Sequence, residues 1–309
     1  MRKFWQKIKP SSRKFKPLII ALVCLVVCIC VPCVAKKNKG GAAASADKTV
    51  LTIWQIDSFE GGKGSRAGFL QKCGDEFSQS GGCYVSVVSI SAEAARLNLA
   101  KGTVPDLISY GAGTYGLESF ITDYTVWCYG GYCILTLDAN SDFSDISNDN
   151  TVVNEGKDNL SSAAALACGV SGAKYGKTTG AYVTLINGGC KYLLGTQRDI
   201  YRLKTRGVSF AVKPVTQFND LYQCISVVSK SANAERANSF IKFLSGKGAE
   251  INSLGMLSSA KNLYDDEMRI MEGVNYDSKL TSPVSENTLN SIKKAISDGD
   301  INMLKNLLK

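Results

Sequence analysis

The pattern of apolar and polar residues along the chain predicts an alternation of strands and helices. Apolar runs of strand length occur at Val50–Trp54, Tyr84–Ile90, Asp106–Tyr110, Cys133–Leu137, Ala181–Ile186 and Cys224–Val228. Between them, apolar residues recur at helical spacing over Arg66–Phe77 and over Ala234–Leu244, and Asn233 is placed to cap the second helix. Such alternation favours an α/β fold with parallel sheets that are covered by helices on both faces.

Two of the expected strand ends are polar or rich in glycine, and parallel sheets bind ligands beyond such ends. They are Trp54–Gly62 and Gly111–Gly116. In the first, Trp54 stands close to Asp57 and Glu60. An aromatic face can stack on sugar C–H groups, and carboxylates accept hydrogen bonds from hydroxyl groups. The segment therefore predicts a binding site for a polyhydroxylated small molecule, without an evident nucleophile.

The carboxyl-terminal segment Ser285–Leu308 carries apolar residues at helical intervals, with a break near Asp298–Asp300. This pattern predicts two short helices that pack on a lobe. A partner-binding helix is the alternative interpretation of the same pattern.

Residues 1–35 have the layout of an export signal. Their basic residues precede the apolar run Leu18–Ala35, which is also long enough to span a bilayer. A cleaved signal, a retained membrane anchor and a lipid-modified cysteine stay open, although Pro32 before Cys33 differs from the small residue usual at lipidation sites. We expect the rest of the chain at the extracellular face of the cytoplasmic membrane, anchored or secreted, with residues 36–48 as a flexible linker.

The formal net charge of +9 comes mostly from the amino-terminal segment. Residues 1–35 contribute seven basic side chains and no acid, so the rest of the chain carries only +2. A nearly neutral chain of this length gives no electrostatic reason to expect a phosphate backbone as partner. We therefore expect no nucleic-acid partner.

The cysteine and histidine content limits the chemistry. The chain has no histidine, which removes the commonest general base and the commonest metal ligand. Seven cysteines follow the amino-terminal segment without CxxC spacing, so no zinc ribbon is indicated. Cys73 with Cys83 and Cys128 with Cys133 are local disulfide candidates, and buried free thiols are the favoured alternative. We expect no metal, no cofactor and no enzymatic activity.

Three motif matches are interpreted without a cofactor or a metal. The GxGxxG pattern of Gly111–Gly116 follows the third expected strand instead of the first, so a dinucleotide site is not favoured. Ser171–Thr178 resembles a phosphate loop, but serine replaces its first glycine, and we interpret it as a polar loop. The acidic residues of Asp138–Asp149 imitate a calcium loop with Phe143 at the turn glycine, so a solvated loop is favoured.

The chain resembles bacterial extracellular solute-binding proteins of family 1, the receptors of carbohydrate ABC transporters. The resemblance is carried by LTIWQIDSFEGGKGSRAGFLQKCGDEF, LAKGTVPDLISYGAG, WCYGGYCIL and FNDLYQCISVVSKSANAERANSFIKFLSGKGAEINSLGMLSS. It covers roughly residues 49–260. It implies a two-lobed periplasmic-binding-protein-like (class II) fold with a ligand cleft between the lobes.

The resemblance also implies the domain organisation. Lobe 1 is expected at residues 49–118 plus 218–247, and lobe 2 at residues 119–217 plus 248–309. The region Asp138–Thr179 is a short polar stretch where family members have a helical block. We therefore expect a reduced second lobe.

The mechanism implied by the resemblance is a clamp that closes on its ligand at hinge segments and is then recognised by the transporter. Arg66 would pair with Glu60 or cap a helix face. The ligand-binding residues expected from the strand ends and the family pattern are Trp54, Asp57, Glu60, Gly111, Tyr115, Trp127, Tyr129, Tyr132, Asp220 and Tyr222.

The leading functional hypothesis is a solute receptor that delivers a sugar or oligosaccharide to the permease subunits of an ABC importer. A membrane-tethered binding or adhesion protein without transport duty is the main alternative. A secreted carbohydrate-active enzyme is the third. Glycosidase chemistry needs two carboxylates that face each other across a bond, whereas Asp57 and Glu60, three residues apart on one loop, fit better as two contacts to one side of a ligand.

The predicted site has a direct test in the Trp54→Ala variant. If Trp54 is an aromatic anchor for the ligand, the substitution weakens binding by about tenfold or more. A ligand titration measures this effect, and unchanged affinity would count against the site.

Overall fold

The structure is a computed structural model that describes residues 49–81, 83–111, 114–156, 160–274 and 285–308. The expected export signal and linker lie outside the described residues. Within the described part of the chain, helices are too short or too polar to cross a membrane.

The first sheet is mixed, with strand order β2-β1-β3-β10-β4. Its strands are β1 (Val50–Gln55), β2 (Tyr84–Ser89), β3 (Leu107–Gly111), β4 (Thr125–Tyr129) and β10 (Tyr222–Val227). β1 runs parallel to β2 and β3, whereas β10 runs antiparallel to β3 and β4. The expectation of parallel strands therefore holds for β1, β2 and β3, but it is wrong for β10, which enters this sheet from the second lobe through a short connection.

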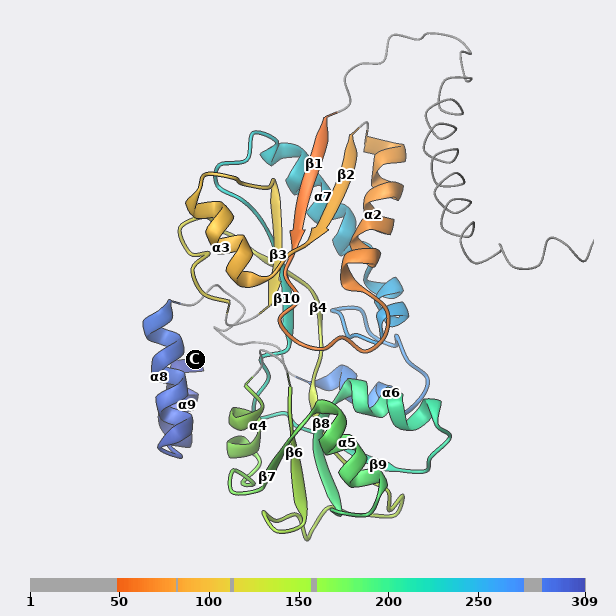
Figure 1. The fold of residues 1–309 in the computed structure, drawn as a ribbon. Helices are drawn as coiled ribbons and strands as arrows, with labels where there is room; N and C mark the ends of the chain where they lie inside the picture. Colours follow the sequence, from red (N-terminus) through yellow and green to blue (C-terminus); the bar gives the residue numbers. More distant parts are fainter. Residues whose placement is uncertain (1–48, 82, 112–113, 157–159, 275–284, 309) are drawn as a thin grey trace, which may run out of the picture. The chain divides into compact units, whose positions relative to one another are not determined.

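Helices flank the first sheet in Figure 1. They are α2 (Arg66–Gly81), α3 (Ala92–Ala100) and α7 (Ala234–Ser245). α2 packs on β2 and on α7, and α7 also contacts β4 and β10. The Trp127 ring stacks on Phe69 of α2 with centroids 5.8 Å apart, and Phe77 meets Phe240 of α7 edge to face at 5.5 Å. The first contact anchors α2 to the sheet, and the second joins α2 to α7.

The second sheet has strand order β7-β6-β8-β5-β9. Its strands are β5 (Tyr132–Thr136), β6 (Thr151–Glu155), β7 (Lys174–Lys177), β8 (Tyr192–Thr196) and β9 (Ala211–Pro214). Its helices are α4 (Ser161–Ala167), α5 (Thr178–Ile186) and α6 (Gln197–Thr205). β6 is parallel to β7 and β8, and β5 is antiparallel to β8 and β9. This lobe is therefore a mixed α/β unit of its own.

The carboxyl-terminal prediction is confirmed. Two helices, α8 (Glu286–Ser297) and α9 (Ile301–Leu308), pair with each other and pack on α4. Two 3-10 segments precede them, η2 (Gly248–Leu254) and η3 (Glu267–Gly273).

Two local predictions in the second lobe are wrong. Ala181–Ile186 was expected as a strand but belongs to α5, where Ala181, Tyr182 and Leu185 form the buried face at helical spacing. A short apolar run does not distinguish a buried strand from a buried helix turn. The presumed polar loop Ser171–Thr178 contains the edge strand β7, whose residues are largely exposed.

Asn233 occupies the N-cap position of α7, but its side chain makes no capping hydrogen bond. Its Nδ2 donates instead to Asp106 Oδ1 at 3.0 Å. Hydrogen bonds to Asp106 from Thr52, Ser231 and Asn233 hold the pKa of this carboxyl below its usual range, against the effect of burial. Asn233 therefore ties the start of α7 to the start of β3.

The chain leaves the first sheet later than the sequence indicated. β4 pairs with β10 in the first sheet, with Tyr222 opposite Tyr129, whereas residues 119–129 were expected in lobe 2. The segment after α7 also stays with the first sheet, because Leu257 forms a β-bridge with Tyr129. The transition from the first sheet to the second therefore falls at Gly130–Gly131.

The seven cysteines of the described residues are free thiols, so neither candidate disulfide forms. Cys73, Cys128 and Cys133 are buried, and burial raises the pKa of Cys73 and of Cys128 to about 12 and that of Cys133 well above its usual value. Burial also raises the pKa of the half-buried Cys168 and Cys190 to about 11. These thiols behave as apolar packing residues.

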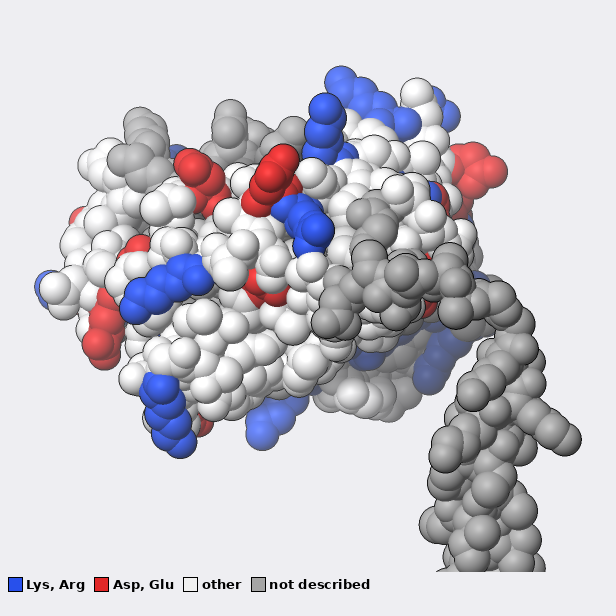
Figure 2. Space-filling view, turned by 90° about the horizontal axis from the view of Figure 1, so that it is seen from above, with Lys and Arg blue, Asp and Glu red and all other residues white. Residues whose placement is uncertain are grey.

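Charges on the outside are mixed in sign. Lys and Arg lie interspersed with Asp and Glu on the face drawn in Figure 2. One group of ion pairs joins α2 to the η2 segment, with Lys247 Nζ 2.6 Å from Glu76 Oε2 and 2.9 Å from Glu250 Oε1.

The loop after β1 packs directly against the turn that follows η2. The Gly62 amide donates to Met256 Sδ at 3.4 Å, and the Lys63 amide donates to the Leu254 carbonyl at 2.6 Å. A Cβ atom on Gly62 would lie 2.0 Å from the Gly255 carbonyl oxygen. Gly255 itself has φ of +60°, which favours glycine. The two backbones can approach this closely only because both residues are glycine.

We predict that Gly62→Ala destabilises the protein by about 1–3 kcal/mol, because its Cβ would push two backbones apart. Gly61→Ala is the matched control, since a Cβ there meets nothing within 4 Å. Its free energy of unfolding should stay within about 0.5 kcal/mol of the wild type. Urea unfolding of both variants measures the difference, and equal stabilities would contradict the close approach.

Candidate ligand site where the two sheets meet

The loop that follows β1 is held in place by Arg66, the first residue of α2. Arg66 Nε donates to Asp57 Oδ1 at 2.9 Å, and Nη2 donates to the Phe59 carbonyl. The guanidinium carbon lies 4.4 Å from the centroid of the Phe59 ring. Arg66 thus neither pairs with Glu60 nor caps a helix face, and it occupies one oxygen of Asp57, whose side chain is 50% exposed.

Glu60, in the same loop, faces the second lobe. Its Oε2 lies 2.9 Å from Nη1 of Arg198 and 3.8 Å from Nη2 of Arg202, and both arginines belong to α6. The three side chains are 22–33% exposed. Two guanidinium groups from the second lobe therefore converge on one carboxylate oxygen from the first.

The start of α6 is organised by a buried carboxylate, Asp199. Its Oδ2 accepts from the Thr196 amide at 3.1 Å and from Asn154 Nδ2 at 3.0 Å. Its Oδ1 accepts from Arg202 Nη1 at 2.9 Å. Thr196 and Asp199 form a capping box, which satisfies the first amides of α6. Asp199 thereby orients Arg202 and Asn154 together.

A small cavity lies at this junction, with a volume of about 10 Å³. Its lining residues come from both lobes: Phe59, Glu60, Asn154, Gly156, Thr196 and Leu221. The Asn154 side chain is buried, and its Oδ1 has no hydrogen-bond partner among the described residues. Such an unpaired acceptor costs free energy unless a ligand or water donates to it. The cavity has room for about one water molecule.

A larger hollow of about 270 Å³ lies along α6, lined by residues that include Lys63, Tyr201, Lys204 and Asp266. Its charged groups already have partners. Lys204 pairs with Asp266, and the Lys63 ammonium lies 5.3 Å from the centroid of the Tyr201 ring. The charged groups that line this hollow are therefore already paired, whereas the small cavity contains a residue with an unpaired acceptor.

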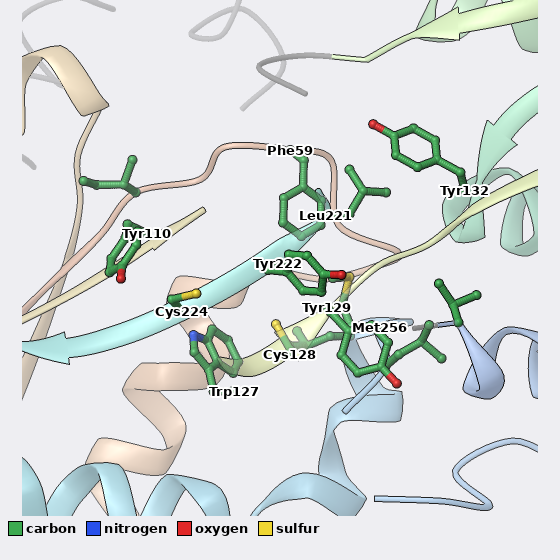
Figure 3. Packing of buried hydrophobic residues seen from close by; sticks show 14 of the residues in the cluster. Phe59, Tyr110, Trp127, Cys128, Tyr129, Tyr132, Leu221, Tyr222, Cys224 and Met256 are labelled. Atoms are coloured by element: carbon green, nitrogen blue, oxygen red, sulfur yellow. The ribbon is translucent and has the colours of Figure 1, made fainter. Parts of the chain in front are cut away.

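Most of the aromatic residues expected to bind ligand are packed inside the lobes. Each is at most 8% exposed: Trp54, Trp127, Tyr129, Tyr132 and Tyr222. Figure 3 shows Trp127 and Tyr110 within the core around β10, and Phe59 beside Leu221. Trp127 Nε1 also donates to Ser109 Oγ at 3.0 Å. In the present arrangement of the lobes, these aromatic side chains do not line the cavity.

Gly111 and Tyr115 flank a segment that is only partly described. A Cβ on Gly111 would lie 1.3 Å from Ser58 Oγ, so the end of β3 packs tightly on the loop after β1. The Tyr115 ring is covered by Arg96, whose guanidinium carbon lies 4.3 Å from the ring centroid. Gly113 of the GxGxxG pattern lies outside the described residues.

Asp220 lies in the connection from β9 to β10, and both of its carboxylate oxygens accept hydrogen bonds. Oδ1 accepts from the Tyr132 hydroxyl and Oδ2 from the Leu160 amide, each at 2.7 Å. Burial raises the pKa of Asp220 to about 6, although these hydrogen bonds act in the opposite direction. Asp220 connects the β9–β10 segment to β5 and to the start of α4.

Of the ten expected residues, Glu60 lines the cavity. The residues that sequence reasoning missed are Asn154, Thr196, Arg198 and Arg202. The two arginines are four residues apart on an amphipathic helix, a spacing typical of an ordinary solvated face. Asn154 stands at the end of a short apolar run and belongs to no recognisable sequence motif. Neither pattern carried a signal for binding.

Comparison with known proteins places the fold. No family model and no curated protein matches the chain. Among solved structures, the chain is similar to the spermidine/putrescine ABC transporter substrate-binding protein PotD from Streptococcus pneumoniae (TM-score 0.55, 11% identity). It is also similar to the sugar-binding protein MalE from Xanthomonas citri (TM-score 0.54, 12% identity). These matches cover 85% and 84% of this chain, and 100% and 95% of the other chains.

Iron-bound HitA from Pseudomonas aeruginosa matches 84% of this chain and 99% of its own, with a TM-score of 0.51 and 11% identity. The chain has the two-lobed α/β fold of periplasmic binding proteins. The named ligands of these similar structures differ widely, so the shared fold does not identify a ligand for this chain.

We predict that the stability effect of Asp220→Asn depends on pH. Because the pKa of Asp220 is about 6 when folded and 3.8 in its ordinary state, the folded protein binds this proton more tightly. Its contribution to stability therefore falls as the pH rises from about 4 to about 6.

Relative to the wild type, Asp220→Asn should gain about 2 kcal/mol between pH 4 and pH 7, because the wild type loses that stability as its buried carboxyl gives up the proton. Urea unfolding at both pH values measures this change. The exposed Asn238→Ala variant, which changes no titrating group, is the control and should show the same effect at both pH values. A pH-independent difference for Asp220→Asn would contradict the buried carboxylate.

Proposed function

We propose that the chain is an extracytoplasmic solute-binding receptor that captures a small solute between its lobes and delivers it to the permease subunits of an ABC importer. The contact between Glu60 and Arg198 carries this proposal. It joins a loop of the first lobe to a helix of the second, beside a cavity with an unpaired acceptor. A ligand that enters there contacts both lobes, as a clamp mechanism requires.

The proposed role is binding without catalysis. Within the described residues, the cavity has no nucleophile paired with a base, and no group of three or more candidate metal ligands occurs. The solute predicted from the sequence is a sugar or oligosaccharide.

The proposed location is the extracellular face of the cytoplasmic membrane. It rests on the basic and apolar pattern of residues 1–35, with residues 36–48 as tether. A signal, an anchor and a lipid-modified cysteine all fit this location.

The small size of the cavity favours a second candidate function. A volume of about 10 Å³ excludes any solute larger than water while the lobes stay in this arrangement. A membrane-tethered binding protein without transport duty, whose lobes remain closed, would also have this feature.

A thermal-shift screen of the purified full-length chain tests the proposal. The screen covers mono-, di- and oligosaccharides, amino acids and polyamines. A ligand at about a hundred times its dissociation constant stabilises the folded state by about 2.7 kcal/mol, which raises the melting temperature by a few degrees.

The expected result is a shift with one solute class, together with a change in small-angle X-ray scattering when that ligand is added. Recovery of unchanged ligand after long incubation would separate a receptor from a secreted carbohydrate-active enzyme. A cooperative melt that no solute moves would contradict the receptor and favour the closed, non-transport protein.

A further inference from the structure

We propose that the solute recognised at this junction is a small zwitterion of the α-amino acid class. Its carboxylate would take the place of Glu60 on Arg198 and Arg202, and its ammonium group would pair with Glu60. The inference rests on the receptor function proposed above and names its substrate class.

The charges at the junction favour a ligand that carries both signs. Glu60 and Asp199 balance Arg198 and Arg202, so the four groups sum to zero. An anion that displaced Glu60 would leave that carboxylate unpaired, and a cation bound to Glu60 would leave Arg198 unpaired. Unpaired charges in a partly buried site are costly. A zwitterion replaces each half of the existing ion pair and keeps every charge paired.

The two guanidinium groups already form a carboxylate site. Both approach the same oxygen, Glu60 Oε2, at 2.9 and 3.8 Å. Arg202 is oriented by its hydrogen bond to the fully buried Asp199. Arginine presents a planar fork of donors that matches a carboxylate, and little reorganisation is needed when a second carboxylate replaces the first. In the absence of ligand, Glu60 acts as the stand-in for the ligand carboxylate.

The unpaired acceptor in the cavity fits the other end of such a ligand. Asn154 is 4% exposed, and its Nδ2 is fixed by Asp199, so its Oδ1 is left to face a donor. An ammonium group has three N–H donors and no acceptor. Glu60 and Asn154, whose residues line the same cavity, provide two of the acceptors that this group requires once the cavity widens.

Size and surface also favour a small solute over an oligosaccharide. The cavity of about 10 Å³ must widen for any ligand, and a small solute requires the least separation of the lobes. Among the described lining residues the aromatic side chain is Phe59, which is 5% exposed. Arg66 covers its ring. A sugar would therefore find no open aromatic face in this cavity on which to stack.

Isothermal titration calorimetry of the full-length chain with the standard L-amino acids tests the inference. For the amino acid that binds, the methyl ester lacks the carboxylate and the N-acetyl derivative lacks the ammonium group. Each derivative should bind at least about tenfold more weakly than the free amino acid, the scale of one lost charged contact. Equal affinity of either derivative would overturn the inference.

Two variants assign the two ends of the ligand. In Arg198→Gln, the affinity ratio between free amino acid and methyl ester should fall towards one. In Glu60→Gln, the ratio between free amino acid and N-acetyl derivative should fall instead. Arg269→Gln and Glu118→Gln, which alter exposed residues, are the matched controls and should keep both ratios. Thermal melting verifies that all four variants are folded. Ratios that stay unchanged in both test variants would overturn the assignment.

The outcomes separate this inference from the receptor function. Binding of a sugar or a polyamine, with no binding of any amino acid, would overturn the zwitterion and leave the receptor standing. If no solute of any class binds and the scattering profile does not change, both proposals fail.

Discussion

The described structure depends on how the polar backbone is satisfied where the chain passes from one sheet to the other. Three connecting segments meet there, and buried amide side chains link them. Gln197 Oε1 accepts from the Gly131 amide at 3.1 Å, and its Nε2 donates to Met256 Sδ at 3.4 Å. Asn219 Nδ2 donates to the Gly130 carbonyl at 2.9 Å. Because buried backbone groups must be paired, these amides hold the connecting segments in one arrangement, which in turn positions Glu60 and Arg198.

Much of the fold follows from the apolar pattern, and its limits have a physical origin. Local periodicity identified α2, α7 and the two carboxyl-terminal helices, because each buries one face. It failed for Ala181–Ile186, where a short apolar run fits a strand and a helix equally well. The direction of β10 was also missed. Strand direction depends on a long-range connection, and side-chain alternation along one strand does not encode it.

The candidate site was predicted only in part for a similar reason. Glu60 could be found because acidic residues after a strand point to a ligand edge. Asp57 lies in the same loop, but its pairing with Arg66 depends on where α2 begins in space. Trp127 and Tyr132 have the residue types of a sugar site, yet the sheets bury both. Composition alone does not separate an aromatic anchor from an aromatic core. Arg198 and Asn154 could not be recognised from the sequence, because their place beside Glu60 depends on how the two lobes pack together.

The buried thiols have a practical consequence for observing lobe movement. Cysteine reagents attack the thiolate, and burial keeps Cys73, Cys128 and Cys133 protonated at neutral pH. Cys168 and Cys190, although half-buried, also have a raised pKa of about 11. A reporter cysteine placed on the surface of each lobe would therefore react with a maleimide dye or a spin label well before these native thiols. Distances between the lobes can thus be recorded without removing these five cysteines.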